Sequence, residues 1–193
     1  MKNPQENEMR FILSILKSPE KEYNANNLAK HLNMSSMGVL KIAKRLEKQD
    51  IISFREVGKA KIYSINLDSD YARQYVKLLL KKETENASSY VRRWIKELNK
   101  IKSAKAVILF GSVLKKEKEA RDIDVLAIID KKGFEKAKKE IEEINSLNEK
   151  KIHPVYQTKE DLRKHINERD KVILNALKGI VVVGEDIIIE NLK

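Results

Sequence analysis

Two short apolar runs in the second half of the sequence place the strongest constraint on the fold. Residues 106–110 read Ala-Val-Ile-Leu-Phe, and residues 123–129 are apolar apart from Asp124. Short apolar runs without helical spacing are typical of strands that are buried on both faces of a sheet. We therefore expect two successive buried strands that are connected through a short helix.

The residues that follow alternate between helical and strand patterns. A charged helix is expected at residues 134–144, a third strand at 151–156, a long helix from the capping residue Thr158 through Leu177, and a short last strand at 180–183. Strands that alternate with helices indicate an α/β or α+β domain of about 90 residues. We expect an α+β chain in which this domain is a mixed sheet with flanking helices.

A small polar motif follows the first strand, and an acidic motif begins the second. Gly111-Ser112 comes directly after the first apolar run, where a missing Cβ lets the backbone approach a ligand closely. Ser112 opens the short helix, whose free N–H groups and hydroxyl suit a phosphate. Either motif alone is common in loops and caps, but their combination on successive apolar strands is rare.

The acidic motif has the geometry of a cation site. Asp122 and Asp124 are two residues apart on a strand, so both side chains point to one face while Ile123 enters the core. Two adjacent carboxylates repel each other unless a cation lies between them. Hard oxygen ligands of this kind favour Mg²⁺ or Mn²⁺.

The combined motif resembles the DNA polymerase beta-type nucleotidyltransferases, and within them the minimal nucleotidyltransferases of prokaryotes and archaea, over about residues 102–184. The resemblance implies that Gly111 and Ser112 contact nucleotide phosphates. It implies that Asp122 and Asp124 are the catalytic carboxylates, which bind Mg²⁺ (or Mn²⁺). The substrate would be a nucleoside triphosphate, from which a nucleotidyl group passes to an acceptor hydroxyl.

The sequence departs from the family pattern next to both motifs. Arg121 stands where active members commonly have a small polar residue before the first acid. Leu114-Lys115-Lys116 stands where they commonly have a small residue, Arg and Gly. Lys115 is our candidate for a phosphate contact in place of the arginine, and Lys116 could also serve. A solvated helix face is the alternative role for both lysines.

The third carboxylate of the family, which lies on a later strand, is not found. The corresponding strand at residues 151–156 contains no acid. His153 falls near the expected place, where it could act as a base or a metal ligand; a surface histidine at a strand edge is the alternative. Glu160 and Asp161 are expected in the first turn of a helix, where the helix dipole favours acids. Nucleotide and metal binding are therefore better supported than turnover.

The first 67 residues show three helices followed by a hairpin. Residues 33–36 form a turn with capping side chains between the second and third helices. Strands are expected at residues 51–57 and 60–67, joined at Gly58-Lys59, a turn-forming pair. This order resembles the winged helix-turn-helix of prokaryotic regulators, in which the third helix enters the major groove and the wing contacts the DNA backbone.

By that resemblance, eight residues of the third helix and the wing would contact DNA. They are Ser35, Ser36, Met37, Lys41, Lys44, Arg55, Lys59 and Lys61. Lys41 and Lys44 are three residues apart and lie outside the apolar core stripe of the third helix, so the geometry permits this contact. A winged helix that is used for protein contacts is the alternative.

Residues 68–101 are expected to form two connecting helices. They lie between a winged-helix domain at residues 1–67 and a nucleotidyltransferase-like domain at residues 102–193. The apolar stripe of the first connecting helix is expected to comprise Tyr71, Tyr75, Leu78 and Leu79. The pair could also carry a homodimer contact.

Charge and composition narrow the class of protein. The net charge is +11, and residues 1–100 hold 20 Lys and Arg against 12 Asp and Glu, whereas residues 101–193 hold 20 against 17. The excess in the first half suits a polyanion such as DNA, and a solubilising surface is the alternative.

No apolar run approaches the roughly 20 residues that span a bilayer, and there is no cysteine for disulfides or thiolate metal sites. We expect a cytoplasmic protein without a membrane partner.

The sequence is compatible with two functions. The first is Mg²⁺-dependent transfer of a nucleotidyl group from a nucleoside triphosphate to an unknown acceptor, with DNA recognition in the same chain. The second is a DNA-binding transcriptional regulator or antitoxin-like protein, whose nucleotidyltransferase-like half binds nucleotide with little or no turnover and which could have a toxin-like protein partner. The Gly-Ser motif and the pair of aspartates favour the first, which is the function that we expect. The missing third acid and the basic winged helix favour the second, which is the alternative.

Overall fold

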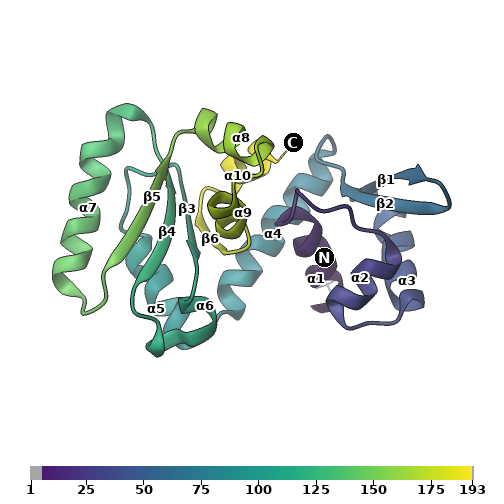
Figure 1. Cartoon of the computed structure of the whole chain (residues 1–193), viewed down its shortest axis with the longest axis horizontal. Coiled ribbons are helices and arrows are strands. Elements are labelled where there is room, and N and C mark those ends of the chain that lie inside the picture. The colour runs from purple at the N-terminus through teal and green to yellow at the C-terminus, as the bar shows by residue number, and fades with distance from the viewer. Residues whose placement is uncertain (1–5, 193) are drawn as a thin grey trace. The chain divides into compact units, whose positions relative to one another are not determined.

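Three helices and an antiparallel hairpin come first in the computed structural model, which describes residues 6–192. The helices are α1 (Glu6–Leu16), α2 (Ala25–Leu32) and α3 (Ser36–Lys48), and the hairpin strands are β1 (Ile52–Val57) and β2 (Ala60–Ile65). Figure 1 labels these elements at the N-terminal end of the chain. Their order is that of a winged helix-turn-helix, as expected.

Local sequence signals set the boundaries of this helix-turn-helix. Asn33 ends α2 in the left-handed conformation, and the Ser35 side chain begins α3 by accepting a hydrogen bond from the Gly38 backbone N–H. Gly58, with φ of 59°, turns the hairpin. The core of this part lies between the helices and β2, where Phe11, Leu28 and Leu46 are fully buried.

The chain divides into two compact units between Leu79 and Leu80, and the second comprises Leu80–Leu192. Helix α4 (Asp70–Asn86) contains this division, and α5 (Ser89–Leu98) follows it. The buried side of α4 differs from the expected stripe. Tyr71 and Leu78 are exposed, whereas the buried residues are Ala72, Tyr75, Val76, Leu79 and Leu80. The expected stripe and the observed buried face differ mainly by a shift of one residue and have the same helical period. The sequence pattern alone therefore does not distinguish them.

A four-stranded mixed sheet forms the centre of the second unit. Its strands are β3 (Ala106–Phe110), β4 (Ile123–Ile128), β5 (Ile152–Gln157) and β6 (Ile180–Val183), in the order β5-β4-β3-β6. Strand β3 is antiparallel to β4 and β6, whereas β4 and β5 are parallel. The chain is therefore α+β, with a winged helix followed by a mixed sheet and flanking helices.

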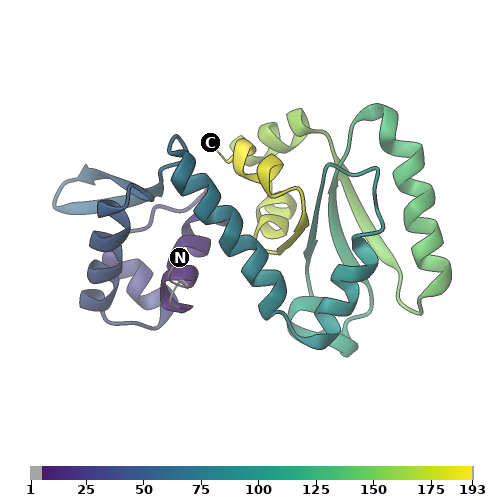
Figure 2. The ribbon, with the colours of Figure 1, turned by 180° about the vertical axis from the view of Figure 1, so that it is seen from behind.

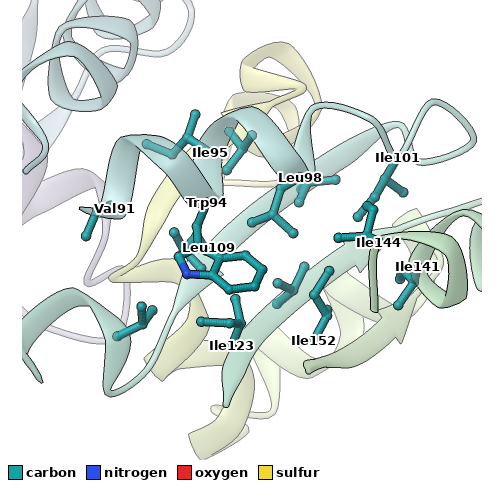
Figure 3. Packing of buried hydrophobic residues seen from close by; sticks show 14 of the residues in the cluster. Val91, Trp94, Ile95, Leu98, Ile101, Leu109, Ile123, Ile141, Ile144 and Ile152 are labelled. Carbon is teal, nitrogen blue, oxygen red and sulfur yellow. The ribbon is translucent and has the colours of Figure 1, made fainter. Parts of the chain in front are cut away.

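Helices cover both faces of the sheet. On one face, α5 and α7 (Phe134–Leu147) pack against residues such as Leu109, Ile123 and Ile152. Figure 2 shows teal α5 on the near side of the strands, and Figure 3 shows the Trp94 ring of α5 among Leu109 and Ile123. On the other face, α9 (Lys171–Leu177) contacts β3 and β4.

The prediction of one long helix from Thr158 to Leu177 is wrong, because this segment forms two helices. The first, α8 (Lys159–Asn167), begins at the expected capping residue Thr158, which forms a capping box with Asp161. The chain then turns at Arg169, whose φ is 57°, and the Asp170 side chain caps α9 by accepting from two backbone N–H groups. A further helix, α10 (Glu185–Asn191), follows β6 and was not expected. Among residues 6–192, no helix combines the length and apolar character that a membrane span requires.

Candidate functional site

Three strands bring their functional residues to one end of the sheet. Antiparallel pairing places Phe110, at the end of β3, opposite Asp124 near the start of β4. Parallel pairing places Asp124 opposite His153 near the start of β5. Gly111 follows Phe110 directly, so the Gly-Ser motif, the acidic motif and the histidine all meet at this end (Figure 1).

Asp122, Asp124 and His153 form a cluster of three side chains, here called the Asp-Asp-His cluster. Each offers one ligand atom, and these atoms lie within 4.8 Å of one another. The Nδ1 of His153 is 3.2 Å from Oδ2 of Asp122. Both aspartates are half-buried and the histidine is exposed, so the cluster is open to solvent on one side. Two carboxylates and an imidazole at these separations match the donor set of a divalent-cation site.

Gly111 is held in a conformation that only glycine adopts easily, and it lies against Asp124. Its φ is 81°, and a Cβ at this position would meet Oδ2 of Asp124 at 2.0 Å. The glycine therefore provides the space that the Asp124 carboxylate occupies. The sequence predicted a close approach at this position, and the group that approaches in this structure is one of the predicted ligands.

The surroundings of Asp124 both raise and lower the pKa of its carboxyl group. Burial raises the pKa of Asp124, and the neighbouring Asp122 carboxylate raises it further. His153 and a hydrogen bond from the backbone of Ser112 lower the pKa. The net result is a pKa above the ordinary value, because burial and a neighbouring carboxylate both disfavour the charged form.

Ser112 connects the sheet to the short helix α6 (Val113–Lys116). It stands at the N-cap of α6, but its hydroxyl makes no capping hydrogen bond. Lys115 and Lys116 are exposed on α6. The hydrogen bond from its backbone to Asp124 places Ser112 beside the Asp-Asp-His cluster.

Lys150 anchors the loop that leads into Asp122, and sequence reasoning missed it. Its Nζ donates to the backbone carbonyl oxygens of Lys118 and Ala120, and it lies 5.8 Å from the centre of the Tyr90 ring. These contacts fix the end of the loop two residues before the first ligand. No local pattern distinguishes Lys150 from the other lysines of the chain.

The residues predicted to contact DNA lie on α3 and the hairpin. All eight are exposed: Ser35, Ser36, Met37, Lys41, Lys44, Arg55, Lys59 and Lys61. Met37 has 63% of its surface exposed, which is high for a methionine. Ser35 also caps α3, so its hydroxyl already has a structural role.

Two of the wing residues have partners within the chain. Arg55 forms an ion pair with Glu22, and both side chains are largely exposed. Lys61 lies over the Phe54 ring, with Nζ 3.5 Å from its centre. A groove of about 710 Å³ lies between α3 and β2. Its lining residues are Leu40, Ala43, Lys44, Glu47, Lys48, Lys61 and Tyr63.

A buried carboxylate of α1 connects α1 to α3 and to α4. Glu8 of α1 is only 5% exposed, and it accepts hydrogen bonds from Arg45 of α3 and from the Tyr75 hydroxyl of α4. Burial and the hydrogen bond to Glu8 raise the pKa of Tyr75 well above its ordinary value. This network was not predicted, because its three members are far apart in the sequence.

Comparison with known proteins agrees with the assignment of the second unit. Residues 93–185, just under half of the chain, match the family model described as polymerase beta, nucleotidyltransferase. The matched segment contains the Gly-Ser motif, the acidic motif and β5. The second unit therefore contains a nucleotidyltransferase-like domain, and the first has a winged-helix fold. No curated protein matched the chain.

Similar solved structures overlap about half of the chain. AF1382 from Archaeoglobus fulgidus is 16% identical, with a TM-score of 0.34, over 42% of this chain and 84% of that one. The adhesin competence repressor AdcR from Streptococcus pyogenes is 18% identical, with a TM-score of 0.39, over 49% of this chain and 69% of that one. ZitR of Lactococcus lactis, a zinc-responsive MarR family member, is 11% identical, with a TM-score of 0.30, over 50% of this chain and 72% of that one. These TM-scores are below 0.5, so the matches say nothing about the function of this chain.

Proposed function

We propose that the protein transfers a nucleotidyl group from a nucleoside triphosphate to an acceptor hydroxyl and that its winged helix binds DNA. The convergence of Gly111-Ser112 with Asp122 and Asp124 at one end of the sheet carries the first part. The match of residues 93–185 to a nucleotidyltransferase family model supports it. The acceptor is unidentified, because one scaffold serves many acceptors.

Each residue of the site has a role in this proposal. Asp122 and Asp124 would hold the divalent cation, Mg²⁺ or Mn²⁺, and the Gly111-Ser112 backbone would lie along the phosphates. Lys115 would add positive charge beside them. A bound cation would neutralise the charge that develops as the acceptor oxygen attacks the α-phosphorus and pyrophosphate leaves. The protein's own contribution would be positioning, because Gly111 leaves room for the Asp124 carboxylate.

The transfer experiment uses the full chain with radiolabelled ATP, CTP, GTP or UTP, a divalent cation, and protein, RNA, DNA or small-molecule acceptors. Label should move to an acceptor with the wild type and fall by at least about 100-fold with Asp122→Asn or Asp124→Asn. Asp130→Asn is the matched control, because Asp130 lies beyond the far end of β4 and pairs with Lys105 at 2.7 Å. Equal transfer by all four proteins would contradict the proposal.

The DNA-binding part rests on the exposed positive charge of α3. Lys41 and Lys44 lie on its solvent face together with the exposed Met37, and in this fold such a helix enters the major groove. The excess of basic residues in residues 1–100 adds the sequence-independent attraction that DNA phosphates provide.

The DNA experiment measures binding to a pool of random-sequence duplexes as a function of salt. The logarithm of the binding constant should fall linearly with the logarithm of salt concentration. Lys41→Ala with Lys44→Ala should weaken binding and reduce the slope by about 1–2. Lys138→Ala with Lys139→Ala removes the same charge from exposed positions on α7 and should leave the slope nearly unchanged. Identical slopes for both double variants would exclude this surface.

A second candidate function is a regulator or antitoxin-like protein that binds nucleotide without transferring it. The observation that favours it is β5, which carries His153 where a third carboxylate would lie. In that case, equilibrium binding of a nucleoside triphosphate with Mg²⁺ would be lost in Asp122→Asn, while no acceptor would ever take label. A protein partner would then be sought by co-purification with the products of neighbouring genes.

A further inference from the structure

We propose that His153 is the third ligand of the Asp-Asp-His cluster and that it makes the site select a zinc-class ion, such as Zn²⁺ or Co²⁺, over Mg²⁺. This inference deepens the proposed function and rests on the same cluster. It replaces Mg²⁺ or Mn²⁺, the cations that the family resemblance implies, with a zinc-class ion, and it names the residue that selects this ion.

The strand register is the first argument. Asp124 and His153 are direct partners in the parallel pairing of β4 and β5, so their side chains leave the same face of the sheet side by side. Asp122 is two residues before Asp124 and points to that same face. The histidine is therefore placed by two regular strands and not by a loop, which gives a ligand set a defined geometry.

The orientation of the imidazole is the second argument. Its Nδ1 is 3.2 Å from Oδ2 of Asp122, although 63% of the histidine side chain is exposed and free to turn elsewhere. Two ligands that bind one ion at about 2.1 Å lie roughly 3 to 4 Å apart. This pair already has that separation. The ligand atoms of all three residues lie within 4.8 Å of one another, so Asp124 is also close enough to share an ion with this pair.

The chemistry of the donors decides which cation fits. Mg²⁺ demands octahedral oxygen coordination and gives up its water reluctantly. Imidazole nitrogen suits Zn²⁺ and its neighbours in the first transition row, which accept nitrogen together with carboxylate oxygen. A site with two carboxylates and one imidazole leaves a position open for a phosphate oxygen or water. No cysteine is present to compete for such ions.

Cation binding can be measured without nucleotide, which separates this inference from the proposed function. Titration calorimetry with Zn²⁺ and with Mg²⁺, on tag-free full-length protein, should give binding of Zn²⁺ at least about tenfold tighter than of Mg²⁺. His153→Ala should weaken Zn²⁺ binding by about 10–100-fold, as loss of a ligand or its close support does, and change Mg²⁺ binding by less than about threefold. Visible absorption of bound Co²⁺ should lose intensity in the same variant.

The chain offers matched controls, because it contains three histidines. His165, whose Nδ1 lies 2.8 Å from the Gln157 side-chain oxygen, and His31 of α2 are both outside the cluster. His165→Ala and His31→Ala should leave Zn²⁺ affinity and the Co²⁺ spectrum unchanged. Equal loss in these variants would mean that zinc binds elsewhere and would overturn the inference, as would unchanged binding in His153→Ala.

A converse variant tests the selection itself. His153→Asp places a carboxylate opposite Asp124 and should reverse the preference, with Mg²⁺ binding strengthened and Zn²⁺ binding weakened relative to the wild type. A preference that stays the same in His153→Asp would overturn the role of the imidazole. Failure of all nucleotidyl transfer, with the zinc preference intact and dependent on His153, would contradict the proposed function and leave this inference standing.

Discussion

Asp124 occupies the space that a side chain at position 111 would need. The contact is between a carboxylate and a backbone position whose φ of 81° favours glycine, so two separate physical terms act on one residue. The first is the strain of a left-handed conformation, and the second is a direct collision with a predicted cation ligand. They can be separated experimentally, because Gly58 also has a positive φ of 59° but has no heavy atom within 4 Å of its Cβ position.

Gly111→Ala should therefore cost more than Gly58→Ala. Left-handed strain alone costs about 1–2 kcal/mol, which is the expected loss in unfolding free energy for Gly58→Ala. Gly111→Ala should exceed that loss by at least about 1 kcal/mol and should also abolish divalent-cation binding, since Asp124 must move. Denaturant unfolding and calorimetry measure the two effects. Equal losses for both variants, with cation binding intact, would show that Asp124 adjusts without consequence.

At the scale of elements, a single carboxylate holds three helices of the first unit together. Glu8 of α1 is buried, and its two oxygens accept from Arg45 of α3 and Tyr75 of α4. A buried carboxylate without such partners would be costly. The network thus links α1, α3 and α4 in addition to the buried apolar face of α3.

Tyr75→Phe should destabilise the protein by about 1–2 kcal/mol, because it removes a hydrogen bond to a buried charge. Tyr71→Phe is the matched control, since Tyr71 is 48% exposed on the same helix, and it should change stability by less than about 0.5 kcal/mol. Thermal or denaturant unfolding at neutral pH measures both. Similar values for the two variants would argue against the network.

The same tyrosine predicts a pH dependence. The pKa of Tyr75 is raised in the folded protein by burial and by Glu8, whereas in the unfolded chain it is about 10. Above that pH the unfolded chain releases the proton and the folded protein keeps it, so stability falls as the pH rises. The wild type should lose stability more steeply than Tyr75→Phe as the pH rises above about 10. Parallel curves for the two proteins would contradict the raised pKa.

At the scale of the whole molecule, each predicted activity belongs to one compact unit. The Asp-Asp-His cluster consists entirely of residues from Leu80–Leu192, and the predicted DNA contacts all lie before Leu79. Sites that share no residues are expected to contribute additively.

Variants in one unit should therefore leave the activity of the other unchanged. Asp122→Asn with Asp124→Asn should bind random-sequence duplexes with the same affinity and salt slope as the wild type, within about twofold. Lys41→Ala with Lys44→Ala should bind divalent cations normally. Electrophoretic mobility shift and calorimetry provide the two readings. A large change in either cross-measurement would instead reveal coupling between DNA binding and the nucleotidyltransferase-like domain.

Local signals in the sequence were enough to locate much of the fold and part of the site. The apolar runs at residues 106–110 and 123–129 predicted β3 and β4, and the capping residues Ser35 and Thr158 marked the starts of two helices. The candidate residues Gly111 and Ser112 were inferred from their place after the first apolar run. The candidates Asp122 and Asp124 were inferred from their spacing, because a strand's alternation fixes which residues share a face. Each of these inferences depends on neighbours within a few residues.

Only the tertiary structure decided how these pieces meet. The parallel register of β4 and β5 places His153 opposite Asp124, and no pattern within residues 151–156 specifies the partner strand or its alignment. The expected buried face of α4 was partly wrong, and the break between α8 and α9 was not predicted. More than one apolar stripe, and more than one helix boundary, is compatible with the helical period of these segments. Pairing and packing join residues that are distant in the sequence, so their outcome depends on the whole core. The sequence alone determined which residues could form a cation and phosphate site, with His153 as one possible ligand, and the sheet decided that this imidazole lies beside the two aspartates.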